Sequence, residues 1–204
     1  PDVSLAPSTS RRRVVVTGLG LVSPVGNSVS DAWDNIIAGK SGIGPITRFD
    51  ASAMSVRIAG EVKGFDVTTY LSGKEARRMD TFIHYGMAAG IQAVRDSGIE
   101  VTAENADRIG VNIGSGIGGL PMIEETHNAY LAGGPRKISP FFIPGSISNM
   151  VSGNLSILFG YKGPSYAIVS ACTTATHSIG DAARLIEYGD ADVMVAGGTE
   201  ATIC

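Results

Sequence analysis

An apolar segment that runs directly into a helical pattern constrains the fold of this chain more than any other feature. Residues 166–169 are aromatic, small or branched, as in a strand that is buried on both faces. Apolar residues then recur at three- and four-residue steps from Ala175 to Ile186, and Gly189 follows where a helix often ends. The pattern predicts a strand, a tight turn and a helix, with Cys172 at the turn.

Cys172 carries the most reactive side chain of this unit. The first backbone N–H groups of a helix are unpaired and form the positive end of the helix dipole, which favours a thiolate over a thiol. The simpler interpretation is a small cysteine buried in the core. His177 is five residues further on and points about 140° away around the helix. We therefore interpret His177 as a packing or surface histidine rather than as the base for Cys172.

Other strand and helix patterns alternate along the chain. Strands are predicted at 14–16, 109–113 and 193–196, and helices at 30–37, 72–97 and 146–159. Ser30 is the expected cap of the first helix, and Ser72 with Glu75 has capping-box spacing at the second. Residues 40–70 indicate irregular structure with short extended pieces. This order predicts an α/β domain with a mostly parallel sheet that helices cover on both faces.

A glycine-rich string, Gly-Ser-Gly-Ile-Gly-Gly at 114–119, follows the predicted strand at 109–113. It satisfies Gly-x-Gly-x-x-Gly, but a dinucleotide site also needs a helix that begins at once and an acidic residue about twenty positions on. Pro121 argues against the helix, and residues 132–135 are Ala-Gly-Gly-Pro. A phosphate loop would need Gly-Lys-Ser/Thr, which is missing. The string is better explained as backbone that packs too closely for side chains.

Three basic residues, Lys74, Arg77 and Arg78, lie at the start of the helix predicted at 72–97. Cations are unfavourable at the positive end of a helix dipole, and Lys74 and Arg78 also repel at four-residue spacing. The simpler interpretation is a solvated face that Glu75 and Asp80 partly neutralise.

Composition argues against several classes of protein. The formal net charge of −3 gives no reason to expect a nucleic acid as partner. Two cysteines make no disulfide framework, no metal-ligand spacing occurs, and no apolar run approaches the length that spans a membrane. We expect no metal, no nucleic acid, no membrane and a reducing cytoplasm. Residues 1–12 are predicted to be a flexible tail or a remnant of cloning.

Two stretches around Cys172 resemble a known family. They are Ser-Ala-Cys-Thr-Thr-Ala-Thr-His-Ser-Ile-Gly-Asp-Ala-Ala-Arg-Leu-Ile at 170–186 and Tyr-Gly-Asp-Ala-Asp-Val-Met-Val-Ala-Gly-Gly-Thr-Glu at 188–200. Both are similar to the active-site region of bacterial β-ketoacyl-acyl-carrier-protein synthases, the condensing enzymes of fatty-acid synthesis. The similarity runs from about Arg13 to the last residue and is greatest to the elongating type II enzymes. It implies a thiolase-like fold, layered α/β/α/β/α in the complete enzyme, and a homodimer in which the nucleophile strands pair.

The resemblance also implies roles for three residues. Cys172 would take an acyl group from an acyl carrier protein, and decarboxylation of malonyl carrier protein would supply the carbanion that attacks the thioester. Ile117 would project from the glycine turn toward the acyl pocket, and Phe142 would line the pocket from across the dimer interface. Either apolar side chain could simply belong to a core. No metal or dissociable cofactor is implied, since the carrier protein brings the phosphopantetheine arm.

Basic residues at positions that match Lys74, Arg77 and Arg78 help to receive the acidic carrier protein in similar synthases. Such a patch would act mainly on the rate of encounter, and its effect would weaken with salt. The resemblance thus offers a functional reason for the unfavourable charges at this predicted helix.

Enzymes of this family have two similar halves, and the second supplies two histidines and a lysine for decarboxylation. None of the three histidines of this chain, His84, His127 and His177, lies in a matching motif. We expect residues 13–204 to be the N-terminal thiolase-like half of a longer enzyme, incomplete at its C-terminal end and inactive alone in condensation. A related thiolase or polyketide condensing enzyme, and a non-catalytic fragment that docks the carrier or dimerises, stay open as alternatives.

Overall fold

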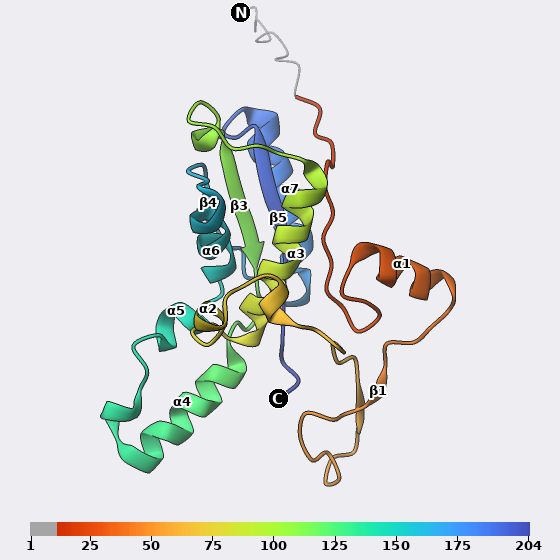
Figure 1. Ribbon diagram of the computed structural model, residues 1–204, viewed down its shortest axis with the longest axis vertical. Helices are drawn as coiled ribbons and strands as arrows, with labels where there is room; N and C mark the ends of the chain where they lie inside the picture. Colours follow the sequence, from red (N-terminus) through yellow and green to blue (C-terminus); the bar gives the residue numbers. More distant parts are fainter. Residues whose placement is uncertain (1–11) are drawn as a thin grey trace, which may run out of the picture.

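The computed structural model describes residues 12–204 and contains a three-stranded parallel sheet (Figure 1). The central strand β3 (Ile109–Gly114) pairs along its whole length with β5 (Val193–Gly198). On its other side β3 pairs through two residues with the short strand β4 (Ser165–Tyr166). The predicted parallel sheet is confirmed, and its order β4-β3-β5 leaves β4 and β5 as edges.

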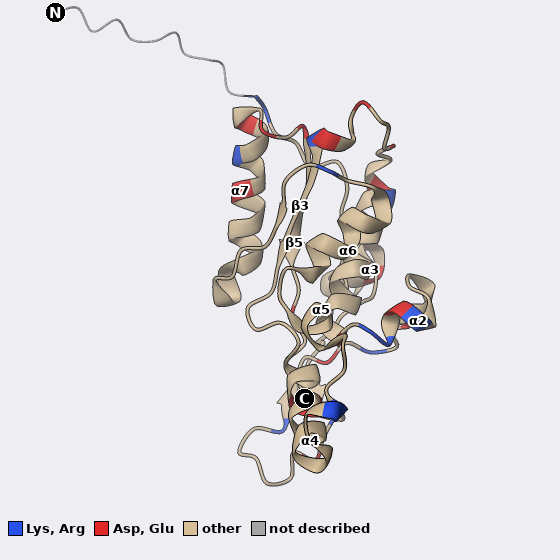
Figure 2. Cartoon of the chain, turned by 90° about the vertical axis from the view of Figure 1, so that its left-hand side faces the viewer, with Lys and Arg blue, Asp and Glu red and all other residues tan. Residues whose placement is uncertain are grey.

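Helices cover both faces of this sheet, as predicted (Figure 2). All residues of β3 are buried, and alternate residues such as Val111 pack in the hydrophobic core with α3 (Thr81–Ser97) and α6 (Met150–Phe159). On the opposite face α7 (Thr174–Tyr188) packs against β3 and β5. Side chains of a strand alternate between the two faces, so the continuous apolar pattern of β3 follows from this double cover.

The helix predicted at 72–97 is in fact two helices, α2 (Gly73–Ala76) and α3. The predicted capping box is present at the start of α2. The chain then breaks because Asp80 caps α3, where its carboxylate accepts a hydrogen bond from the Phe82 N–H. The single predicted helix is therefore wrong, since a second cap lies within one apolar stripe.

The strand predicted at 14–16 is also wrong. Val16 is 79% exposed, and the hydrogen bond from the Leu19 N–H goes to the carboxylate of Asp96 on α3. The segment lies against α3 at close range, since a Cβ atom on Gly20 would stand 1.8 Å from the carbonyl oxygen of Ala89. The segment therefore packs against α3 and does not pair with a strand. The tail predicted at 1–12 falls outside the described residues except for Arg12.

The region between this segment and α2 is largely irregular, as predicted. Its helix α1 (Val29–Ile37) begins at the cap Ser28, two residues before the predicted cap Ser30. Two short antiparallel strands follow, β1 (Gly44–Pro45) and β2 (Ile58–Ala59), and then a 3-10 turn, η1 (Val67–Thr69).

A helical arm, residues 120–146, extends away from the sheet (Figure 1). It consists of α4 (Leu120–Gly133), the 3-10 turn η3 (Pro135–Lys137) and α5 (Phe142–Ser146). The sequence reading missed α4, although a proline fits the first turn of a helix, where no N–H is needed. The helix predicted at 146–159 is wrong at its start, because α5 ends at Ser146 and α6 begins only at Met150.

Candidate active site

Cys172 lies on a sharp turn between β4 and α7. The strand predicted at 166–169 is shorter than expected, since β4 ends at Tyr166, and Cys172 is the middle residue of the 3-10 turn η4 (Ala171–Thr173). Its side chain is exposed, which argues against the interpretation as a core cysteine. As the second residue of a helical segment, Cys172 presents one of the N–H groups that have no partner within the helix.

The residue before Cys172 has a strained backbone. Ala171 has a φ angle of 53° and is the only non-glycine residue between 12 and 204 with a positive φ. A conformation of this kind costs about 1–3 kcal/mol and persists only where the surrounding structure determines it. The turn therefore has the geometry that holds a nucleophile away from the sheet, and the predicted strand-turn-helix unit is confirmed.

Ser170 is fixed by hydrogen bonds at three of its atoms. Its N–H donates to Thr174 Oγ1 at 2.9 Å, and its carbonyl accepts from the Thr173 N–H at 3.2 Å. Its hydroxyl lies 2.7 Å from Nδ1 of His177, one turn further along α7. His177 is exposed, as predicted for a surface histidine, and its ring contacts Ser170. These bonds fix the residue that joins the predicted strand segment to the turn of Cys172.

The glycine turn at 114–119 packs against the turn that carries Cys172. A Cβ atom on Gly116 would lie 3.3 Å from Cα of Ala171, and one on Gly114 would lie 2.0 Å from the carbonyl oxygen of Ile168. The prediction that these glycines mark close backbone contacts is confirmed. Ile117 directly follows Gly116, so the structure brings it next to the segment of Cys172. Its side chain is 57% exposed.

Glu200, which follows β5, holds the glycine turn in place. One carboxylate oxygen accepts from Ser115 Oγ at 3.0 Å and the other from the Ile117 N–H at 3.1 Å. Ser115 is buried, and its hydroxyl oxygen also accepts from the Gly118 N–H at 3.0 Å. Sequence reasoning missed Glu200, because its partners lie more than 80 positions away.

Phe142 is not brought to Cys172 within this chain. It is the first residue of α5 in the helical arm, is half-buried, and its carbonyl accepts from Ser146 Oγ at 2.7 Å. Helix α5 contacts α4 and α6. Its expected place in an acyl pocket depended on a partner subunit, so that expectation stays a prediction.

The three predicted docking residues are exposed around α2, which lies at the edge of the molecule in Figure 2. The helix-dipole argument about them is wrong: α2 is only four residues long, and Arg77 and Arg78 follow its C-terminal end, where cations are favourable. The guanidinium of Arg78 lies 4.3 Å from the ring centroid of Phe141 at the base of α5. Lys74 and Arg77 form no ion pair within residues 12–204, so they are better placed than Arg78 to meet a partner.

Asp80 is a second residue that sequence reasoning did not assign to the site. Its buried carboxylate accepts from the Phe82 N–H at 3.2 Å and from the Met122 N–H at 2.8 Å, so it caps α3 and the first turn of α4 together. Burial raises the pKa of Asp80 above its usual value, while these hydrogen bonds oppose the shift. An aspartate directly before a helical pattern was the local signal for this cap.

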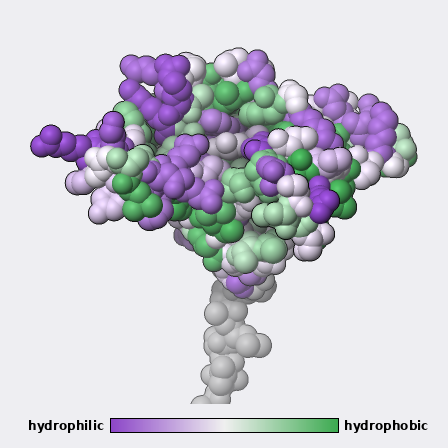
Figure 3. Space-filling view, turned by 90° about the horizontal axis from the view of Figure 1, so that it is seen from below, coloured by the Kyte–Doolittle hydropathy of each residue, from purple (hydrophilic) through white to green (hydrophobic). Residues whose placement is uncertain are grey.

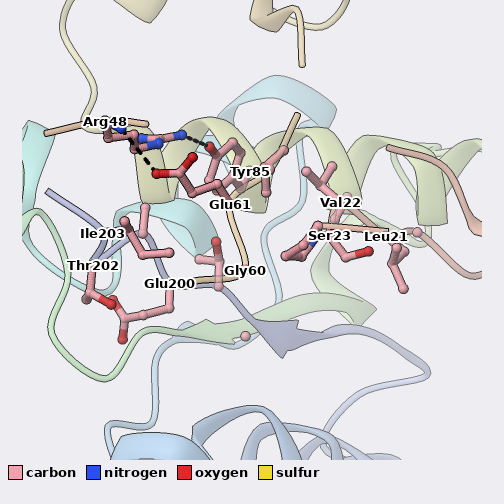
Figure 4. Close-up of a pocket in the computed structure, with 17 residues that line it drawn as sticks. Leu21, Val22, Ser23, Arg48, Gly60, Glu61, Tyr85, Glu200, Thr202 and Ile203 are labelled. Atoms are coloured by element: carbon pink, nitrogen blue, oxygen red, sulfur yellow. Dashed lines mark hydrogen bonds between the residues drawn. The ribbon is translucent and has the colours of Figure 1, made fainter. Parts of the chain in front are cut away.

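A cavity of about 470 Å³ lies at the end of β5 (Figure 4). Glu200 lines it, together with Arg48, Glu61 and Tyr85, and Arg48 Nη2 donates to the Tyr85 hydroxyl at 2.6 Å. Neither Cys172 nor a residue of the glycine turn is among its lining residues, so the cavity is linked to the candidate site through Glu200, which bonds to that turn.

Within residues 12–204, no group of three or more His, Cys, Asp or Glu side chains is placed to hold a metal ion. None of the helices described there is long and apolar enough to cross a membrane. The helix α4 begins directly after the glycine string, contrary to the sequence reading, but residues 132–135 still offer no acidic side chain for a dinucleotide.

The sequence is similar to that of known condensing enzymes. The family model described as Beta-ketoacyl synthase, N-terminal domain, matches residues 11–204. A Vibrio cholerae protein named 3-oxoacyl-acyl-carrier-protein synthase 2 is 62% identical over 191 residues, which are 94% of this chain and 46% of that protein. A protein of the same name from Coxiella burnetii is 57% identical, over 93% of this chain and 46% of its own length. The chain thus spans about half the length of the curated relatives it matches.

Solved structures of ketosynthases share the fold. The ishigamide ketosynthase/chain length factor superposes with a TM-score of 0.83 at 27% sequence identity, over 94% of this chain and 48% of that one. A type II PKS acyl-carrier protein in complex with its ketosynthase, AntDE:AntF, gives 0.79 at 28% identity, over 94% and 52% of the two chains. The expected thiolase-like fold is confirmed.

Proposed function

Because the chain belongs to the β-ketoacyl synthase family, we propose that it is the N-terminal part of an acyltransferase that elongates fatty acids, a 3-oxoacyl-acyl-carrier-protein synthase 2. The observation that carries the proposal is the position of Cys172. It is exposed, follows the strained Ala171, and precedes α7. The high identity to relatives of that name supports the choice of reaction.

The proposed reaction begins with acyl transfer to Cys172. Its thiolate attacks the carbonyl carbon of an acyl-carrier-protein thioester, so that a carbon–sulfur bond to Cys172 forms and the carbon–sulfur bond to the carrier's phosphopantetheine breaks. The carrier leaves as a thiolate and takes up the proton that the Cys172 thiol lost when it ionised. The backbone N–H of Cys172, at the start of a helical segment, is one donor for the oxyanion. No metal or dissociable cofactor takes part in this step.

Condensation then uses malonyl carrier protein. Loss of carbon dioxide leaves a carbanion, which attacks the thioester on Cys172 to form a carbon–carbon bond, and the cysteine thiolate is released. The products are 3-oxoacyl carrier protein, carbon dioxide and free carrier protein. Residues 1–204 are expected to be inactive in this second step alone, since no histidine pair and lysine of the family's pattern accompany Cys172.

The acyl chain is proposed to lie beside Ile117, with Phe142 of a second subunit closing the pocket. Ile117 stands next to the turn of Cys172, and Glu200 fixes its backbone N–H. A residue held in this way gives the pocket a defined end. Two exposed thiols, Cys172 and Cys204, agree with a cytoplasmic location, where thiols stay reduced.

The proposed carrier-docking surface consists of Lys74, Arg77 and Arg78. Its support is the exposure of these residues on one side of α2, together with the solved complex of a related ketosynthase with its acyl-carrier protein. A carrier of opposite charge would be steered to this surface, and salt would weaken the steering.

A double reversal of charge, Lys74→Glu with Arg77→Glu, should slow association with the carrier protein at low salt by about tenfold or more, because steering depends on charge at the rim. The control Arg95→Glu reverses an exposed charge in the last turn of α3, at the end of that helix away from α2, and should leave association unchanged. Surface plasmon resonance at two salt concentrations measures both. Equal association rates of the double variant and the wild type would refute the proposal that this surface docks the carrier protein.

Edge strand β4 is the proposed centre of a homodimer. Apolar side chains are exposed around it on α6, on the segment after β4 and on α7, where Ile157, Val169 and Ile179 are 79%, 56% and 55% exposed. Unpaired strand edges and apolar patches of this kind favour association. Hydrophobic surface is also present between hydrophilic projections at the lower end of the molecule (Figure 3).

An Ile157→Glu variant should be monomeric in sedimentation velocity, since a charge would be placed in the proposed interface. The matched control Ile37→Glu changes a side chain that is 69% exposed on α1, away from β4, and should leave the dimer intact. A wild-type protein that sediments as a monomer at micromolar concentration would contradict the dimer.

Polyketide condensation is the second candidate, because one solved neighbour, at 28% identity, is the ketosynthase of a type II PKS. The acyl donor from which free thiol is released discriminates between the candidates. We expect the purified protein to release it from saturated acyl-carrier protein and not to accept acyl-coenzyme A, the donor of a thiolase. Preference for a polyketide starter would favour the second candidate. Carrier binding without release would favour a docking fragment.

A further inference from the structure

One face of α7 is joined to the segment that precedes Cys172. Thr174 and His177 both bond to Ser170, and the carboxylate of Asp181 accepts a hydrogen bond from the Tyr166 hydroxyl. Residues 174, 177 and 181 lie on one face of a helix, because their spacing is three and four. The two arms of the turn are thus tied together at two levels, near Cys172 through Ser170 and further away through Tyr166.

Ser170 directly precedes Ala171, the residue with the strained backbone. Ala171 has a φ angle of 53°, and Cys172 comes next. Its own ψ angle of 43° after a φ of −141° lies outside the strand conformation. Strain persists only where neighbouring contacts determine it, and the Ser170 hydroxyl is held by His177.

We propose that His177 is a positioning residue for Cys172 and acts through Ser170. The inference rests on the proposed function, in which Cys172 is the acyl acceptor. The bond to Ser170 occupies Nδ1 of His177, so this nitrogen serves to hold the turn. It exists in either neutral tautomer, since the Ser170 hydroxyl donates to a bare Nδ1 or accepts from Nδ1–H.

The proposed role of His177 requires a hydrogen-bonding atom at the position of Nδ1. Asparagine carries amide atoms at the same distance along the side chain as Nδ1, whereas the amide of glutamine lies one bond further out. His177→Asn should therefore retain the bond to Ser170, and His177→Gln and His177→Ala should lose it. This order is specific to positioning, because glutamine is the better helix former of the two amides and would be favoured by a merely structural role.

The test follows a single turnover of acyl transfer to Cys172, because no condensation step removes the acyl group in residues 1–204. The limiting rate constant of this transfer and the half-saturating concentration of acyl-carrier protein are written kcat and KM, and the thermal midpoint of each variant is measured beside them. His177→Ala, His177→Gln and Ser170→Ala should each lower kcat by about tenfold to a hundredfold with KM unchanged, as expected for a displaced nucleophile. His177→Asn should restore kcat to near the wild-type value. The double variant of Ser170→Ala with His177→Ala should be no slower than either single variant, because both remove the same bond.

Tyr166→Phe is the control. Burial and the bond to Asp181 raise the pKa of Tyr166 to about 12, so its hydroxyl stays a donor, and the variant loses only the bond further from Cys172. It should lower the thermal midpoint and leave kcat unchanged. A wild-type kcat in His177→Ala, an inactive His177→Asn, or an equal loss in Tyr166→Phe would overturn the inference. Absence of acylation on wild-type Cys172 would instead overturn the proposed function.

Discussion

A Cys172→Ser variant should transfer acyl groups from acyl-carrier protein at least about a thousandfold more slowly than the wild type. A serine hydroxyl is not ionised at neutral pH, and it needs a base in contact to act as a nucleophile. The nearby His177 bonds to Ser170 through Nδ1 and is not placed for that task by any described contact. Loss of free-thiol release from the carrier measures the effect.

The matched control is Cys204→Ser, which changes the other free cysteine of the chain. Although Cys204 is exposed, partial desolvation, with Glu124 nearby, raises the pKa of its thiol, so less of it is present as thiolate at neutral pH. The control should retain the wild-type rate. A Cys172→Ser protein that transfers acyl groups normally would show that the acyl acceptor lies elsewhere.

Gly114→Ala should lower the free energy of unfolding by about 3 kcal/mol or more and should also abolish acyl transfer. Its Cβ atom would lie 2.0 Å from the carbonyl oxygen of Ile168 and 2.6 Å from Cγ2 of Thr174. Ile168 precedes the turn of Cys172, and Thr174 begins α7. The backbone must move on one side of Cys172, which no side-chain rotation can avoid. Urea unfolding followed by circular dichroism measures the loss.

Gly73→Ala is the control for this substitution. A Cβ atom at Gly73 would meet only the end of the flexible Arg77 side chain, at 3.5 Å, and its φ angle is an ordinary one. An alanine in the first turn of α2 should stabilise the protein by up to about 1 kcal/mol. If Gly114→Ala unfolded at the same urea concentration as this control, the close packing of the glycine turn would be refuted.

The strands that form the sheet were predictable where packing on both faces left a continuous apolar run. Strands β3 and β5 were predicted on this basis and are confirmed. The same signal failed at 14–16, where the apolar residues are exposed and the backbone lies against α3. It also overextended β4 to residue 169, since β4 ends at Tyr166 and the carbonyl of Ile168 lies against Gly114 of the glycine turn. Apolar composition reports burial or contact but not the hydrogen-bonding partner.

The candidate site was predictable only where its signal is local. The change of period after Cys172 predicts the turn, and the capping box predicts the start of α2. Glu200 gave no such signal, because its role depends on partners that only the folded chain brings close. The bond between Ser170 and His177 was missed for another reason. Helical geometry places His177 away from Cys172, but the residue that it contacts is Ser170, two positions before Cys172.

The location of the acyl group after incubation with acyl-carrier protein tests the central claim most directly. Intact mass spectrometry of the purified protein, followed by peptide mapping, should show a single added acyl mass on the peptide that contains Cys172. Treatment with hydroxylamine should remove it, as expected for a thioester. An acyl group on another residue, or an unmodified Cys172 in a folded protein supplied with excess acyl-carrier protein, would contradict the proposed role of Cys172.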